Sequence, residues 1–332
     1  MICKSGRIKT EFAVLAVIIA GLTLLLLLRN PDRVKYELPE IPPLERSALD
    51  RIEIQSPKGK VVLQKESEKW RLQPSGHIVD ETRINNALDA LTSLELTTLV
   101  SRSGDDSRYG MEAESAIVVK AFAGDQSVRA FTLGKVASTY RHTFLRLPDD
   151  HGVYHAAGSL RSDFEYGAAD WRDKSVLAFS PDEIFQLSVT AGDRNVTLDR
   201  SAAAAGMKSA NREPAVEEAV AVAWKTTDGR EVDSKTMDPL LRSLAELTCS
   251  EFIRQDAYRK ADDIVLAVTL KGDREYHLEL RRGEEKDGKR YTGTSSAVSE
   301  PFQLEEYTAD ELIRKAEAVF TSATETASST QD

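Results

Sequence analysis

The 332-residue chain has little cysteine, since Cys3 and Cys249 are its only two and neither stands in a C-x-x-C pair. The cysteine content therefore excludes a disulfide framework and a cysteine zinc site, and the fold has to be stabilised by packing. Positive charge is also short, because 44 Lys and Arg residues face 54 Asp and Glu residues and the net charge is −10. The long-range field of such a chain opposes nucleic-acid binding, and we expect no nucleic-acid partner.

Sequence motifs for catalysis are equally scarce, with no G-x-S-x-G elbow and no phosphate loop with its Gly and Lys spacing. Residues 149–155, DDHGVYH, would present His151 and His155 as metal ligands if they formed a helix. The neighbouring Pro and Gly instead predict a turn that enters a strand, along which the two histidines lie about 13 Å apart. Cys249 is expected to be a buried thiol. We therefore expect no catalytic residue, no cofactor and no metal site.

Apolar residues make up 41% of the chain, and seventeen uncharged residues form one run near its start. This run, residues 12–28 (FAVLAVIIAGLTLLLLL), spans about 26 Å as a helix, slightly less than the hydrocarbon core of about 30 Å. No small-residue cleavage site follows it, so we expect an uncleaved signal anchor that forms a transmembrane helix. The anchor positions are Phe12, Leu15, Ile18, Leu22, Leu25 and Leu28.

The orientation of this anchor is predicted from length, because three basic residues precede the run and three follow it. Residues 1–11 form a short tail that we expect to stay in the cytoplasm, while the long remainder is translocated. The expected localisation is the inner membrane, with one span and most of the chain in the periplasm. Residues 29–49 contain several prolines and predict a semi-rigid stalk. The Ser/Thr-rich residues 321–332 predict a disordered tail.

The remainder of the chain contains an internal repeat. The spacing of Ile52, Ile54 and Leu63 recurs in the second half in the set Leu187, Val189 and Leu198. Each set is followed by a tryptophan, a Val-Asp pair and five apolar residues at offsets 0, 3, 4, 7 and 10, which predict an amphipathic helix. The residues that define the repeat and are expected in the core are Trp70, Leu88, Leu91, Leu94, Trp224, Leu241, Leu244 and Leu247.

The start of each repeated helix is indicated by its cap. Asp80 or Asp233 would accept hydrogen bonds from the first unpaired backbone N–H groups. Pro239 would lie deep inside a helix that started after Asp233. The alternative is a helix with Asp238 as its cap and Pro239 at its first position, where a missing N–H costs nothing.

Strand pairs follow each helix, for example residues 115–135 and 263–283, which both turn at a Gly-Asp. The predicted fold class is α+β, with two tandem units of mostly antiparallel sheet. We place these units at residues 50–175 and 176–320, the second with an Ala-rich insertion at 200–218.

The junction between the two halves is marked by Trp171, Arg172 and Asp173, where Arg172 and Asp173 are expected to form an ion pair. Trp171 and its neighbours open the segment WRDKSVLAFSPDEI, which runs through residue 184.

The chain resembles the bacterial family called domain of unknown function 4340 (DUF4340) in five features. These are the anchor, the tryptophan–Val-Asp–helix block, this segment, and the two dipeptides Leu133-Gly134 and Val153-Tyr154. The resemblance covers roughly residues 50–320. It implies an envelope component associated with an ABC-type permease and ATPase and with a gliding-motility-like auxiliary subunit, and no catalytic residue comes with it.

From these features we expect a non-enzymatic subunit or scaffold of an ABC-type envelope or transport complex. Two alternatives remain open. The first is an envelope hydrolase, and the second is a module that binds a small solute or a glycan; either would use a cleft between the two repeats.

Overall fold

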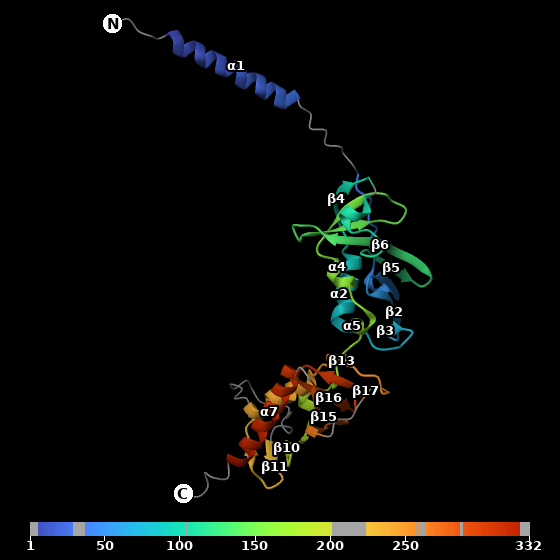
Figure 1. Cartoon of the computed structure of the whole chain (residues 1–332), viewed down its shortest axis with the longest axis vertical. Coiled ribbons are helices and arrows are strands. Elements are labelled where there is room, and N and C mark those ends of the chain that lie inside the picture. The colour runs from blue at the N-terminus through green and yellow to red at the C-terminus, as the bar shows by residue number, and fades with distance from the viewer. Residues whose placement is uncertain are drawn as a thin grey trace, which may run out of the picture. The chain divides into compact units, whose positions relative to one another are not determined.

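The structure, a computed structural model, describes residues 6–28, 37–103, 105–200, 224–256, 258, 263–285 and 288–325. Apart from residue 200, the predicted Ala-rich insertion at 200–218 lies outside the described residues. The chain divides into two compact units (Figure 1). Unit 1 consists of the residues up to Ser67 together with Asn85–Gly167, and unit 2 consists of Glu68–Ile84 together with the residues from Ala168 onward.

The first sheet has eight strands in the order β3-β2-β1-β5-β6-β7-β8-β4. Its strands are β1 (Arg51–Ser56), β2 (Gly59–Glu66), β3 (Lys69–Gln73), β4 (Leu96–Ser101), β5 (Ile117–Ala123), β6 (Gln126–Val136), β7 (His142–Arg146) and β8 (Val153–Ala157). The helices in this part of the chain are η1 (Arg46–Ala48), α2 (Glu81–Thr92), α3 (Asp106–Tyr109), α4 (Arg161–Phe164) and α5 (Ala168–Trp171).

The second sheet has nine strands in the order β12-β11-β10-β9-β14-β15-β16-β17-β13. Its strands are β9 (Gln186–Ala191), β10 (Arg194–Arg200), β11 (Trp224–Thr226), β12 (Glu231–Val232), β13 (Glu251–Phe252), β14 (Asp263–Lys271), β15 (Glu275–Glu285), β16 (Gly288–Ser295) and β17 (Val298–Leu304). Its helices are η2 (Pro181–Glu183), α6 (Ser234–Ala245) and α7 (Glu306–Glu325).

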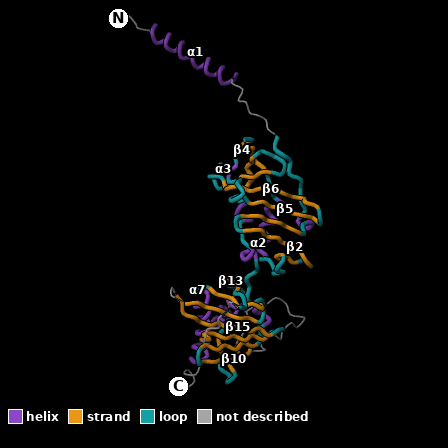
Figure 2. The backbone as a smooth tube through the Cα atoms, turned by 45° about the vertical axis from the view of Figure 1, so that its right-hand side comes forward, coloured by secondary structure: helices purple, strands orange, loops and turns teal. Residues whose placement is uncertain are grey.

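The two sheets share one strand order, apart from the extra short strand β12 at an edge of the second. Figure 2 draws the strands of both sheets in orange. The register agrees as well. Ile52 lies opposite Leu63 in the first sheet, and Leu187 lies opposite Leu198 in the second. All four side chains are completely buried. The predicted α+β class with two mostly antiparallel sheets is confirmed.

The repeated amphipathic helices are α2 and α6. Their apolar stripes are buried, and in the second sheet a single core cluster joins α6 to the strands and to α7. Helix α7 contacts α6 and the strands β9, β12 and β16. The Asp80 carboxylate accepts a hydrogen bond from the backbone N–H of Arg83 at 2.9 Å, which is the predicted cap of α2.

The alternative start for the second helix is wrong. Asp233 caps α6, because its carboxylate accepts from the backbone N–H of Lys235 at 3.0 Å, and Pro239 lies inside the helix. Met237, which precedes the proline, is buried together with Leu240, Leu241 and Leu244, so the helix brings the whole apolar stripe into the core by continuing through Pro239. Packing of the stripe therefore outweighs the hydrogen bond that proline removes.

The predicted tail at 321–332 begins too early. Helix α7 continues to Glu325, because Ala323 is buried and its carbonyl accepts a hydrogen bond from Arg230 at 2.8 Å. The predicted stalk at 29–49 also differs from the structure in its described part, 37–49. The Pro42 carbonyl accepts from Arg129 at 2.7 Å, and Leu49 is buried in the core. The last residues of the predicted stalk are therefore part of unit 1.

Helix α1 (Gly6–Leu28) contains the long apolar run. Within the described part of the chain, no helix combines the length and the hydropathy needed to cross a membrane. The transmembrane helix expected at residues 12–28 is therefore not supported by this finding and stays a prediction.

The proline inside α6 provides a test of the packing argument. Pro239 is exposed, so Pro239→Ala restores a backbone hydrogen bond without removing a core contact. We expect the free energy of unfolding to rise by about 1–3 kcal/mol, measured by urea denaturation. Pro181→Ala is the control, because Pro181 stands at the start of η2, where proline costs nothing. A less stable Pro239→Ala variant would contradict the assignment.

Candidate functional site

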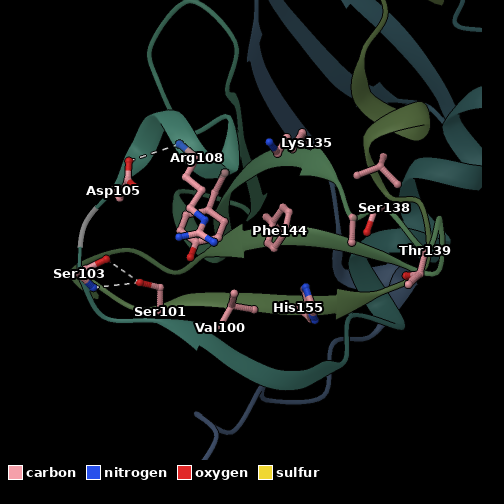
Figure 3. A pocket seen from close by; sticks show the side chains of 13 residues that line it. Val100, Ser101, Ser103, Asp105, Arg108, Lys135, Ser138, Thr139, Phe144 and His155 are labelled. Carbon is pink, nitrogen blue, oxygen red and sulfur yellow. Dashed lines mark hydrogen bonds between the residues drawn. The ribbon is translucent and has the colours of Figure 1, made fainter.

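A pocket of about 750 Å³ opens at one end of the first sheet, in unit 1 (Figure 3). It is lined by residues from the end of β4, from α3, from the end of β6 and the turn after it, and from β7 and β8. Its side chains fall into three groups. The cations are Arg108 and Lys135, the aromatic rings are Tyr109, Phe144 and His155, and the hydroxyl groups are those of Ser101, Ser103, Ser138 and Thr139 in addition to Tyr109.

Two glycines bring α3 close to β6. A Cβ atom on Gly134 would lie 2.1 Å from the carbonyl oxygen of Tyr109, so only glycine fits at this position. Gly110 ends α3 with a φ of +68°, a left-handed conformation that glycine adopts without strain. This contact places Arg108, on α3, beside Lys135, which follows Gly134 on β6 (Figure 3).

Helix α3 is also fastened to the neighbouring strand by charge. The Arg146 guanidinium of β7 forms an ion pair with Asp106 of α3. The pair lowers the pKa of the Asp106 carboxyl and raises the pKa of Arg146. Asp105 caps α3, since its carboxylate accepts from the Ser107 hydroxyl at 3.0 Å and from the Arg108 backbone N–H at 3.4 Å.

The aromatic wall of the pocket is a chain of rings in contact. Phe144 packs edge-on against Tyr109, with ring centroids 4.9 Å apart, and lies 5.0 Å from His155. His155 in turn stacks on His142 at 5.1 Å. Burial, with a smaller contribution from His142, lowers the pKa of His155. At neutral pH the imidazole is therefore uncharged, and the wall is apolar.

The turn before β8 is held by Asp150, three residues before Val153 of the Val153-Tyr154 motif. Its carboxylate accepts from the Tyr154 hydroxyl at 2.6 Å and from the Gly152 backbone N–H at 2.7 Å. Burial and this carboxylate raise the pKa of Tyr154 to about 12. The hydrogen bonds from Tyr154 and Gly152 lower the pKa of Asp150. The motif thus fixes the start of the strand that carries His155.

The structure separates the two histidines of the DDHGVYH segment. His151 lies in the exposed turn, and His155 lies on β8 against Phe144. Within the described ranges, no group of three or more His, Cys, Asp and Glu side chains could hold a metal ion. Cys249 is buried, and burial raises the pKa of its thiol to about 11, so it carries no thiolate at neutral pH.

The residues expected to define the repeat all lie in the core: Trp70, Leu88, Leu91, Leu94, Trp224, Leu241, Leu244 and Leu247. Of the expected anchor residues, Phe12, Leu15, Ile18 and Leu22 are exposed on α1. The side chains of Leu25 and Leu28 lie outside the described residues.

At the expected junction, Trp171 is completely buried. The expected ion pair between Arg172 and Asp173 is wrong. Arg172 pairs with Glu300 and lies 3.4 Å over the Phe252 ring, while Asp173 accepts from the Ser175 backbone N–H at 2.9 Å. Arg172 forms an antiparallel bridge with Val79, and side chains of adjacent residues in extended backbone point to opposite sides.

The two cations of the pocket were not predicted from the sequence. Neither Arg108 nor Lys135 lies in a known motif, and both are ordinary surface residue types. The available signal was Leu133-Gly134, because a glycine in the middle of an apolar strand marks a close backbone approach. That signal indicates a contact, and it does not indicate what the contact places nearby.

The comparisons with known proteins identify one family. The model of the family described as "Domain of unknown function (DUF4340)" matches residues 70–264, which is more than half of the chain and includes every residue that lines the pocket. No curated protein and no solved structure matches the chain.

The close contact at Gly134 predicts a strong effect of a single methyl group. Gly134→Ala would push α3 away from β6, and we expect the free energy of unfolding to fall by about 1–3 kcal/mol, measured by urea denaturation. Ser138→Ala, an exposed position of the same pocket, should leave stability unchanged. Equal stability of the two variants would show that the contact is not required.

The partly buried imidazole of His155 predicts a pH dependence. Because the pKa of His155 is lower in the folded chain than its usual value of 6.5, the unfolded chain binds more protons between these two values. The free energy of unfolding should therefore fall as the pH drops below about 6.5. In His155→Gln this fall should be smaller, whereas His151→Gln, in the exposed turn, should keep it. An unchanged fall in His155→Gln would rule out the assignment.

Proposed function

We propose that this chain, which belongs to the family called domain of unknown function DUF4340, is a non-enzymatic subunit of a membrane-bound envelope complex. In this proposal the other subunits are an ABC-type permease and its ATPase. Residues 12–28 tether the chain to the inner membrane, and the two units stand in the periplasm. The chain then acts by holding other proteins in place.

The observation that carries the proposal is the character of α1. Apart from Thr23, whose hydroxyl donates to the Ile19 carbonyl at 2.7 Å, its described side chains are apolar, and those exposed by half or more are Phe12, Val14, Leu15, Val17, Ile18, Ile19, Leu22 and Leu24. A helix that is apolar all round is found inside a protein or in a membrane, and seldom in water. The uncharged run continues to Leu28 in the sequence. A membrane or the apolar surface of a membrane protein is therefore the environment that suits it.

The repeated fold supports a role in binding other proteins. The two sheets have the same strand order, and a chain with two such units can engage two sites of one partner or two subunits of one assembly. The acidic character of the chain after residue 35 favours a position in solvent, away from anionic lipid headgroups. The units then depend on α1 to remain near the membrane.

Co-purification tests the proposed assembly. The full chain, tagged at its C-terminus and extracted in a mild detergent, should recover a permease and an ATPase in constant proportion to itself. A variant that carries Ile18→Arg and Leu22→Arg should lose both partners, because each arginine costs about 2.5–3.5 kcal/mol at the centre of a membrane helix. Recovery of the native chain alone, under conditions that keep the permease and ATPase together, would contradict the proposal.

Membrane fractionation tests the tether separately. The native chain should stay in the membrane pellet after alkaline carbonate washing, and Ile18→Arg with Leu22→Arg should move it to the supernatant. The control is Tyr307→Arg, which changes a strongly exposed aromatic residue on α7 and should leave the chain in the pellet. Release of the native chain by carbonate would rule out a membrane-spanning tether.

A further inference from the structure

We propose that the pocket of unit 1 binds a small organic anion. Its acidic group would lie between Arg108 and Lys135, and its apolar body would lie against the rings of Tyr109, Phe144 and His155. This site goes beyond the proposed complex and does not depend on it.

The charges of the pocket favour an anion. Within the described residues, neither the Arg108 guanidinium nor the Lys135 ammonium forms an ion pair or a hydrogen bond, and both side chains are exposed. Two other arginines of unit 1 are held by carboxylates, since Arg146 pairs with Asp106 and Arg161 pairs with Glu165. The Arg108 fork is thus available for a ligand, and it matches the two oxygens of a carboxylate or a phosphate.

Among the described lining residues Asp105 is the one carboxylate, and it does not neutralise the two cations. Asp105 is engaged in capping α3 through the Ser107 hydroxyl and the Arg108 backbone N–H. Two cations and one carboxylate give the lining a formal charge of +1, in a chain whose net charge is −10. A positive cavity in an acidic protein concentrates small anions locally.

The hydroxyl groups add donors of the kind that anionic oxygens accept. Ser101 and Ser103 lie on the β4 side of the pocket with their oxygens 2.8 Å apart, and the Ser103 backbone N–H donates to the Ser101 oxygen at 3.1 Å (Figure 3). Ser138 and Thr139 lie on the opposite side, in the exposed turn after β6 (Figure 3). Serine and threonine hydroxyls rotate to donate to whichever oxygen is present.

The aromatic wall determines which chemical group suits the part of the ligand away from its acidic end. The Tyr109, Phe144 and His155 rings, with Val100 and Val136, form a surface that an inorganic ion cannot cover. His155 is uncharged at neutral pH, so this side favours an apolar or flat group. The lining therefore suits a molecule with one acidic end and one apolar end.

The hollow of about 600 Å³ between β10, β11 and α7 in unit 2 offers a contrast. It also contains two arginines, and both are already engaged. Arg194 pairs with Glu317 at 3.3 Å and lies over the Phe320 ring, while Arg230 pairs with Asp228 and donates to the Ala323 carbonyl. The cations there hold α7 in place, so an anion has no equivalent position.

A titration of the full chain in detergent micelles tests the site, with isotope-labelled valine methyl groups as the probe. Val100 and Val136 line the pocket, and their signals are assigned from Val→Ala spectra. Benzoate should shift both signals in a saturable manner. Benzamide, which has the same ring without the charge, and inorganic phosphate, which has the charge without the ring, should bind at least about threefold more weakly.

Charge-removing variants complete the test. Arg108→Gln and Lys135→Gln should each raise the Kd for benzoate at least about threefold, because each removes one of the two cations. Lys120→Gln, which changes an exposed lysine on β5 outside the pocket, should leave the Kd unchanged. Unchanged spectra elsewhere would show that the variants fold. The proposal would be overturned if benzoate and benzamide bound equally or if the shifts lay outside the pocket. It would also be overturned if the Kd for benzoate stayed unchanged in Arg108→Gln and Lys135→Gln.

Discussion

The pairing of buried positions between the first two strands of each sheet is the constraint on which the rest of the structure depends. Ile52 faces Leu63 and Leu187 faces Leu198, and every one of these side chains is shielded from water. A slip of one residue would turn the apolar set of a strand to the opposite face. The first two strands of both sheets pair in the same register. This register determines the positions of the strands that follow and of the loops at their ends.

The pocket of unit 1 shows how this scaffold is adapted locally. The strand β6 meets α3 at Gly134. Because glycine has no side chain, the backbone of β6 can contact the backbone of α3 there. The ion pair of Asp106 with Arg146 holds α3 against β7. The hydrogen bond from Tyr154 to Asp150 holds the turn before β8. The Leu133-Gly134 and Val153-Tyr154 dipeptides of this chain thus each fix an element that carries pocket residues.

Much of the fold could be predicted from spacing, because apolar periodicity records which face of an element is buried. The two repeated helices, their aspartate caps and the strand pairs are local features of this kind. The path of α6 through Pro239, the partner of Arg172 and the end of α7 were missed. Each depends on a contact with a residue distant in sequence, such as Glu300 for Arg172 and Arg230 for Ala323.

The pocket was missed for a related reason. Arg108 and Lys135 are 27 positions apart in the sequence and become neighbours only through a glycine contact between a short helix and a strand. Residue type says nothing of this, because arginine and lysine are common on every protein surface. Within the described residues the charged groups of these two form no ion pair, whereas Arg146 and Arg161 each pair with a carboxylate, and such partners become visible only in three dimensions.

The way the N-terminal segment enters unit 1 has a mechanical consequence. Pro42 is fastened to Arg129 of β6, and Arg46 forms an ion pair with Asp89 of α2, just before the chain becomes β1. Strand β1 lies inside the sheet, paired along its length with β2 on one side and β5 on the other. The hydrogen bonds of both ladders run perpendicular to the strand, so a pull from the N-terminal side loads them together in shear. The sheet resists such a pull far better than it would if the chain entered through an edge strand that could be peeled away one bond at a time.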